Sequence, residues 1–213
     1  MLHANKLLRQ FGIFWLVFLA FQLLFSMDGI RNGLAGMHAS LFTGVAKRTV
    51  AKVEWWKTTV GPENGEIIFN FYSKAQAAQL AAAKRQSGGS GSVQATNYEL
   101  GVDPKYHVYT ALAFLIALFL ATPLQWKRRL ALAAIAAVLF YLFTFLRMTV
   151  KLKYEISQQH IGLYENDPNA FMSLSKVNNL LGALGLIFIV VIFIWAFLVF
   201  TKKNIGQMKV ELS

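Results

Sequence analysis

The sequence predicts a mainly α-helical integral membrane protein with four transmembrane helices and a small extracytoplasmic α+β cap in its first loop. Hydrophobic residues make up 56% of the 213 residues and charged residues only 15%, against about 25% in a typical soluble domain. The hydrophobic residues also gather in four long runs, at 11–27, 108–124, 130–148 and 180–200. Each run is long enough to approach the width of a bilayer core as a helix.

Basic residues stand at alternate ends of these runs. Lys6 and Arg9 precede the first run, Lys127 to Arg129 separate the second from the third, and Lys202 and Lys203 follow the fourth. Because cytoplasmic loops are enriched in Lys and Arg, we predict a bacterial inner-membrane protein with both termini in the cytoplasm. A basic start before an apolar run also fits a signal peptide, but no Ala-x-Ala site follows, so we predict an uncleaved helix.

The runs divide the chain into five predicted segments. Residues 1–27 form the first transmembrane helix, 28–105 an extracytoplasmic α+β loop domain, and 106–148 a transmembrane hairpin. Residues 149–176 form a second extracytoplasmic loop, and 177–213 form the fourth transmembrane helix and a cytoplasmic tail. Within the hairpin, Ala133 and Ala137 lie four residues apart, which permits close helix packing in lipid but also fits alanine as a simple helix former.

The predicted cap has its own pattern of elements. Helical spacing of apolar residues across 30–50 predicts a helix, and the aromatic and β-branched residues of 66–72 predict a strand. Residues 75–85 have high helix propensity, 87–92 have the composition of a flexible linker, and 94–102 contain a second short strand.

Three tryptophans are candidate anchors at the membrane interface. Trp55 and Trp56 stand beside Lys57, and Trp126 stands beside Lys127 in the basic turn. Amphipathic indole rings are enriched at the level of the lipid headgroups. For Trp55 and Trp56, packing inside the outer domain is an equally good alternative.

Several function classes are disfavoured. The chain has no cysteine, which excludes disulfides, thiolate zinc sites and a cysteine nucleophile. The net charge of +11 would suit nucleic acid, but no basic stripe with interleaved aromatics is present. His38, His107 and His160 fit no metal-ligand spacing, and no phosphate loop or nucleophile elbow occurs. We therefore expect no metal, no cofactor and no nucleic-acid partner.

Arg147 is the main candidate for a functional side chain. It ends the third apolar run, where a charge is costly unless it is paired or hydrated, so intramembrane charges are often functional. The alternative is that its long side chain reaches water at the helix end.

The hairpin resembles the core of the exosortase/archaeosortase family of membrane-embedded cysteine transpeptidases. The stretch 121–130, with Pro123 and the basic turn, resembles the end of the family's cysteine helix, and 143–148 resembles its arginine motif. The resemblance implies that Arg147 occupies the position of the catalytic arginine. The cysteine position falls at 108–111, where Tyr109 and Thr110 stand instead.

The resemblance also implies a histidine within 173–178, and none is present. Thr144 or Phe143 stands where the family has asparagine. Without a nucleophile and a base the thiol chemistry cannot run. We therefore predict a non-catalytic relative, accessory to the sorting or processing of exported proteins. Its partners would be membrane lipids and another membrane or exported protein, which would contact Arg147, Tyr109 and Thr110. The alternative is a structural or assembly subunit of a larger membrane complex.

Overall fold

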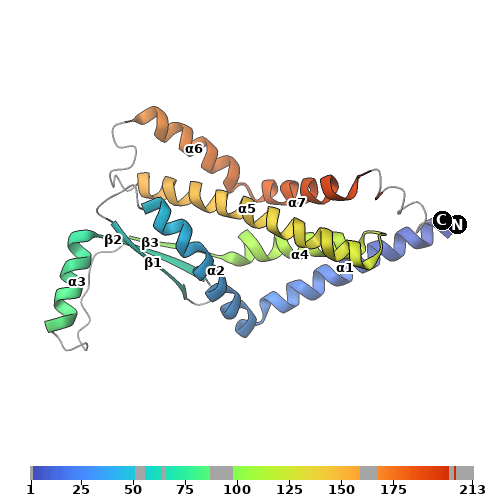
Figure 1. Cartoon of the computed structure of the whole chain (residues 1–213), viewed down its shortest axis with the longest axis horizontal. Helices are drawn as coiled ribbons and strands as arrows, with labels where there is room; N and C mark the ends of the chain where they lie inside the picture. Colours follow the sequence, from blue (N-terminus) through green and yellow to red (C-terminus); the bar gives the residue numbers. More distant parts are fainter. Residues whose placement is uncertain are drawn as a thin grey trace. The chain divides into compact units, whose positions relative to one another are not determined.

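The structure is a computed structural model that describes residues 2–50, 56–63, 66–86, 98–158, 167–201 and 204. Helices account for 83% of these residues, and a small three-stranded sheet is the other regular element (Figure 1). The chain forms two compact units. Unit 1 comprises Met1–Arg31, Pro104–Leu146 and Leu180–Ser213, and unit 2 comprises Asn32–Asp103 and Arg147–Asn179.

Unit 1 is helical and is centred on α4 (Thr110–Ala121), which contacts both α1 (Leu2–Ser26) and α7 (Leu184–Val199). Alternate residues along α4 are buried, and three of the five are alanines: Ala111, Ala113, Leu115, Ala117 and Phe119. Small side chains let helix backbones approach closely, which is how helices associate in lipid. The buried alanines of α4 are therefore suited to close helix packing, whereas the packing of Ala133 and Ala137 stays a prediction.

An aromatic cluster joins α1, α4 and α7 in unit 1. The ring of Phe114 in α4 lies 5.3 Å from that of Phe14 and 5.9 Å from that of Phe18, both in α1. On its other side, Phe114 lies 5.5 Å from Phe188 of α7. All three pairs are edge-to-face, the geometry that aromatic quadrupoles favour.

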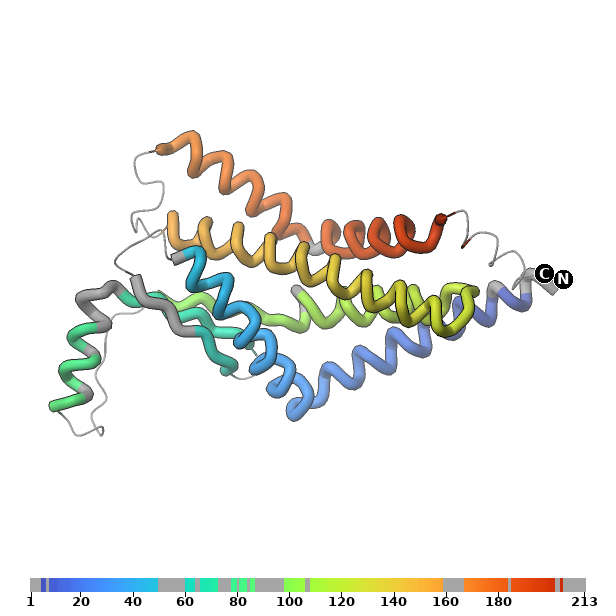
Figure 2. Tube along the Cα trace, viewed as in Figure 1, coloured from blue at the N-terminus to red at the C-terminus, as the bar shows by residue number. Residues whose placement is uncertain are grey.

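The chain reverses between α4 and α5 (Trp126–Gln158) at residues 122–125, as the path in Figure 2 shows, and the residues Lys127 to Arg129 of the basic turn lie in the first turn of α5. The predicted run to Leu124 was too long, because α4 ends at Ala121. The backbone of Thr122 is extended, with ψ of 130°, since the ring of Pro123 disfavours a helical conformation in the residue before it. The Thr122 hydroxyl donates to the Leu118 carbonyl and accepts the indole N–H of Trp195 from α7, at 2.9 Å.

Unit 2 contains the sheet, with strand order β1-β2-β3 and antiparallel pairing throughout. The strands are β1 (Trp56–Glu63), β2 (Glu66–Ser73) and β3 (Tyr98–Val102). The predicted strand at 66–72 is confirmed, and so are the helices α2 (Asp28–Val50) and α3 (Lys74–Gln86). The predicted second strand is confirmed over Tyr98–Val102; the rest of it and the 87–92 linker lie outside the described residues.

The strand β1 was not predicted. The signal for it was Asn64-Gly65, the dipeptide preferred in two-residue hairpins, which stands between the paired residues Glu63 and Glu66.

Two boundaries in the C-terminal half differ from the prediction. The third apolar helix does not end at Met148; α5 continues to Gln158, so its last ten residues replace the start of the predicted second loop. The predicted crossing at 180–200 is divided into α6 (Pro168–Gly182) and α7. Ala183 between them is extended, with ψ of 123°. The glycines Gly182 and Gly185 that flank it are poor helix formers, and they mark this break.

Within the described part of the chain, two helices are long and apolar enough to cross a membrane, one over Leu8–Ser26 and the other α5. A third span results if α6 and α7 together make one broken crossing. The helix α4 is apolar but short, because the π-helical turn η1 (Lys105–Tyr109) precedes it and Pro123 follows its end.

Candidate functional site around Arg147

A single buried stripe runs along α5 and includes Arg147. In unit 1 the stripe consists of Ala136, Phe140 and Thr144, and in unit 2 it continues through Arg147, Met148, Leu152 and Ile156. Apart from Arg147 and Met148, which are adjacent, neighbouring positions of the stripe are three or four residues apart, a spacing that brings helix residues close together. The large apolar residues Leu142 and Leu146 are exposed on other faces. Arg147 is only 8% exposed, which disfavours the alternative that its side chain reaches open water.

Lys151 and Glu155 are two of the charged residues that follow Arg147 on α5. They stand one and two turns on, and Lys151 is attracted by Glu155 and repelled by Arg147. The formal charges of the three residues, two positive and one negative, sum to +1. A net positive charge among partly buried groups favours an anionic ligand.

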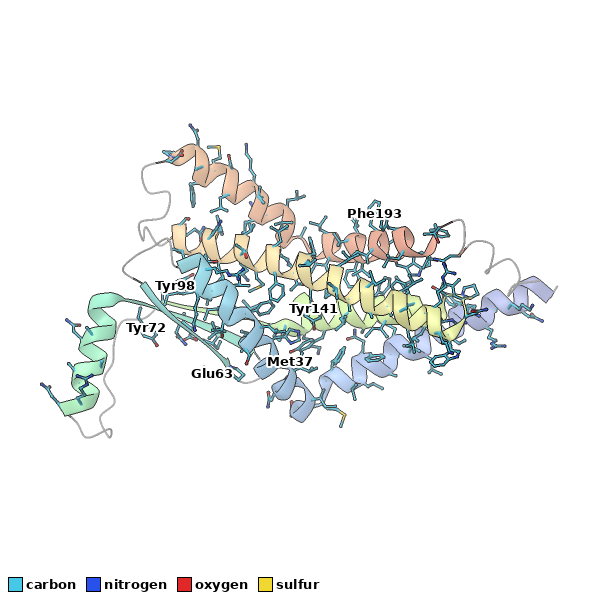
Figure 3. The ribbon with its side chains drawn as sticks, in the orientation of Figure 1. Met37, Glu63, Tyr72, Tyr98, Tyr141 and Phe193 are labelled. Atoms are coloured by element: carbon cyan, nitrogen blue, oxygen red, sulfur yellow. The ribbon has the colours of Figure 1, made fainter. Side chains whose placement is uncertain are left out.

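The acidic residue of this row is held from the sheet. The hydroxyl of Tyr98, at the start of β3 (labelled in Figure 3), donates to Oε2 of Glu155 at 3.0 Å. The Tyr98 ring stacks on Phe71 of β2, with centroids 5.9 Å apart. A charge-assisted bond from a ring that is itself packed fixes the carboxylate in place. Sequence analysis missed this contact because it joins residues far apart in the chain.

The position of Arg147 along α5 can be compared with the thickness of a bilayer. At about 1.5 Å per residue, its 33 residues span about 50 Å, which exceeds the roughly 30 Å hydrocarbon core of a bilayer. Arg147 lies about 32 Å along the helix from Trp126. The part of α5 between Trp126 and Arg147 is therefore about as long as the hydrocarbon core is thick.

The remaining predicted site residues lie in unit 1. Tyr109 is 1% exposed, and its ring lies 5.4 Å from that of Phe25 of α1. The backbone N–H and the hydroxyl of Thr110 both donate to the Lys105 carbonyl, the latter at 2.9 Å, and so close the π-helical turn. Such turns are frequent at functional sites. That Tyr109, Thr110 and Arg147 act together is a prediction that joins the two units, and it stays a prediction.

The other residues that the sequence singled out have no contact in the described structure that indicates a function. Trp126 is 65% exposed at the first residue of α5, whereas Trp55 and the side chain of Trp56 lie outside the described part of the chain. The side chain of His107 and all of His160 lie outside it too. The segment 173–178 belongs to α6, which has no buried residue. Thr144 donates to the Phe140 carbonyl at 2.9 Å, within its own helix.

His38 is the one buried histidine that the structure describes. It lies in α2 with 1% exposure, and its Nδ1 lies 2.8 Å from the Leu34 carbonyl, to which the protonated nitrogen donates. Burial lowers the pKa of this imidazole below its usual 6.5, an effect that the hydrogen bond to Leu34 partly offsets. His38 is therefore a structural residue of α2 in its neutral form.

The lowered pKa predicts a pH dependence of stability. Because the unfolded chain binds the proton more tightly than folded His38, stability is fully present above the unfolded value and falls as pH drops toward the folded pKa. We expect the melting temperature to fall between about pH 7.5 and about pH 5. The variant His38→Gln keeps a side-chain N–H donor but does not titrate, so its melting temperature should fall less over this range. Parallel curves of melting temperature against pH for the two proteins would refute the assignment.

Comparisons with protein-family models, with curated proteins and with solved structures find no match for this chain. The likeness to exosortases therefore rests on the motif residues of the hairpin alone.

Proposed function

We propose that this chain is a non-catalytic integral protein of a bacterial inner membrane, accessory to the sorting or processing of exported proteins. It crosses the membrane four times, with both termini in the cytoplasm. The crossings are α1, the helical run η1–α4, α5, and the broken pair α6–α7. The loop domain at 28–105 then lies outside the cytoplasm, and the basic turn at Lys127 to Arg129 lies inside, as the positive-inside rule requires.

The burial of Arg147 carries this proposal. Arg147 is 8% exposed as a residue, on the inward stripe of an apolar helix, and a charge is expensive to bury at such a position. Its planar donors suit a carboxylate, a peptide C-terminus or a lipid phosphate, each of which can accept two parallel hydrogen bonds. We assign Arg147 to the binding of such a group on the partner. Without a cysteine and without a histidine in the segment 173–178, the thiol chemistry of the resembled family is not expected.

Replacing Arg147 tests the assignment. In cells that express the tagged chain, crosslinked partners are identified by mass spectrometry and then quantified for each variant. We expect Arg147→Ala to reduce the crosslinked partner by about tenfold, the value of one charge-assisted hydrogen bond. Arg147→Lys keeps the charge but lacks the planar guanidinium. The amount of crosslinked partner should therefore lie between those of Arg147→Ala and the wild type.

Lys127→Ala is the matched control, because it removes one positive charge from an exposed position at the opposite end of the membrane-spanning part of α5. Membrane extraction with carbonate checks that every variant is inserted. Partner recovery that is the same for Arg147→Ala and the wild type would contradict the proposal.

A second function, as a structural subunit of a larger membrane complex, is favoured by α6. None of its residues is buried, and it exposes Met172, Val177 and Leu180. An apolar surface of this kind often marks a contact with another protein. The size of the complex solubilised in mild detergent separates the two functions, since a large stoichiometric assembly supports the subunit and a monomer or weak dimer supports the accessory.

A further inference from the structure

A groove in unit 1 lies between the start of α5 and the end of α7. Its volume is about 620 Å³. Apolar residues of both helices line most of it, including Leu132, Phe197 and Phe200, and three polar residues complete it: Arg128, Thr201 and Asn204. Arg128 precedes Leu132 by one turn, and Thr201 and Asn204 follow the end of α7. The polar residues therefore come from the first turn of α5 and from the segment after α7.

Asn204 is a buried residue that lines this groove, and its side-chain oxygen is a hydrogen-bond acceptor. The residue is 1% exposed, and its Nδ2 donates to the Leu198 carbonyl at 2.8 Å. Its Oδ1 accepts no hydrogen bond from any described residue. Buried polar atoms are nearly always paired in folded proteins, so an occupant that can donate a hydrogen bond suits this side of the groove.

Among the described residues of the basic turn, each of the three cations has a different environment. Arg129 is bound to the carbonyls of Leu124 and Leu120 at the end of α4, and Lys127 is exposed and does not line the groove. Arg128 is half-buried and does line it. One guanidinium is thus available to an anion in the groove.

The apolar part of the groove opens onto the lipid-facing side of α7. Phe197 is 79% exposed, and Phe193, one turn before it, is 70% exposed and projects from the helix (Figure 3). An occupant must therefore be amphiphilic, with an anion for Arg128, a donor for Asn204 and a hydrocarbon chain for the aromatic surface. A glycerophospholipid with a hydroxylated headgroup has all three.

We propose that this groove binds one anionic glycerophospholipid of the phosphatidylglycerol type at the membrane face where the basic turn lies. Arg128 binds the phosphate, and Thr201 and Asn204 contact the headgroup hydroxyls. The proposal rests on the membrane insertion stated above and is independent of the role of Arg147.

The test uses the full chain, delipidated in a neutral detergent. Mixed micelles with phosphatidylglycerol or phosphatidylcholine, or inorganic phosphate alone, are titrated while thermal unfolding is followed, and native mass spectrometry counts the bound lipid. We expect saturable stabilisation and one retained lipid with phosphatidylglycerol, a weaker effect with phosphatidylcholine, and none with phosphate. Phosphate as effective as the lipid would show a free-anion site and overturn the proposal.

Three variants locate the site. Arg128→Ala should weaken phosphatidylglycerol binding by about tenfold, whereas Lys127→Ala, which removes the same charge one residue away, should change it by less than about twofold. Leu132→Trp fills the groove and should block binding with every charge in place. Equal losses in the two charge variants, or normal binding by Leu132→Trp, would overturn the proposal. So would binding only after removal of residues 205–213, since the tail would then be the occupant.

Discussion

Replacing Phe69 with alanine should destabilise unit 2 by about 3–5 kcal/mol, the cost of truncating a fully buried aromatic ring. Phe69 is 0% exposed in β2, the central strand, where it pairs with Val60 on one side and Leu100 on the other. Ile67 and Phe71, two residues away on the same strand face, are equally buried. The cavity would therefore lie in the middle of the core, where the surrounding residues have little freedom to collapse.

Hydrogen exchange of the β2 amides measures this loss directly, because their protection reports the free energy of opening. Phe69→Leu is the matched control; it keeps most of the volume and should cost only about 1 kcal/mol. Equal protection in Phe69→Ala and the wild type would mean that β2 is not the core of the sheet.

The elements of unit 2 could be predicted where the pattern is local. Ile67, Phe69 and Phe71 alternate along β2, and apolar residues recur at helical spacing along α2, so each element follows from its own residues. The placement of Glu155 against Tyr98 could not be predicted in this way. It depends on β3 meeting the far end of α5, and single-sequence periodicity carries no information about such a contact.

The ends of the apolar helices could be predicted only in part. Hydropathy identifies residues 130–148 as an apolar run, but α5 continues past the polar residue Lys151 to Gln158. No proline or glycine stands there to end the helix. In contrast, Pro123 and Ala183 interrupt apolar runs that hydropathy treats as continuous. Backbone restrictions, rather than hydrophobicity, set those boundaries.

For Arg147, too, the sequence predicted only part of what the structure shows. The sequence identified it as a charge at the end of an apolar run, with two possible orientations. Its place on the stripe with Thr144 and Met148 favours the buried orientation. Helical periodicity alone could have suggested this, since Phe140, Thr144 and Met148 are four residues apart.

The second large effect is expected at Arg129, in the basic turn. Its Nε donates to the Leu124 carbonyl and its Nη1 to the Leu120 carbonyl, at 3.0 Å for the latter. The last carbonyls of a helix have no partner within the helix; Leu120 lies in the last turn of α4, Leu124 follows the helix, and both hydrogen bonds are partly buried. One guanidinium thus satisfies the end of α4 and joins it to the start of α5. We expect Arg129→Ala to cost about 3 kcal/mol, since two charge-assisted bonds are lost and two carbonyls are left without a donor.

Unfolding in mixed detergent micelles measures this change, and two variants separate its causes. Lys127→Ala removes the same charge from the same turn without touching either carbonyl, so it should stay within about 0.5 kcal/mol of the wild type. Arg129→Lys keeps the charge but cannot reach two carbonyls with a planar fork, and it should recover less than half of the loss. If Arg129→Ala and Lys127→Ala were equally stable, the turn would act through its charge alone. The turn would then orient the hairpin in the membrane without closing it.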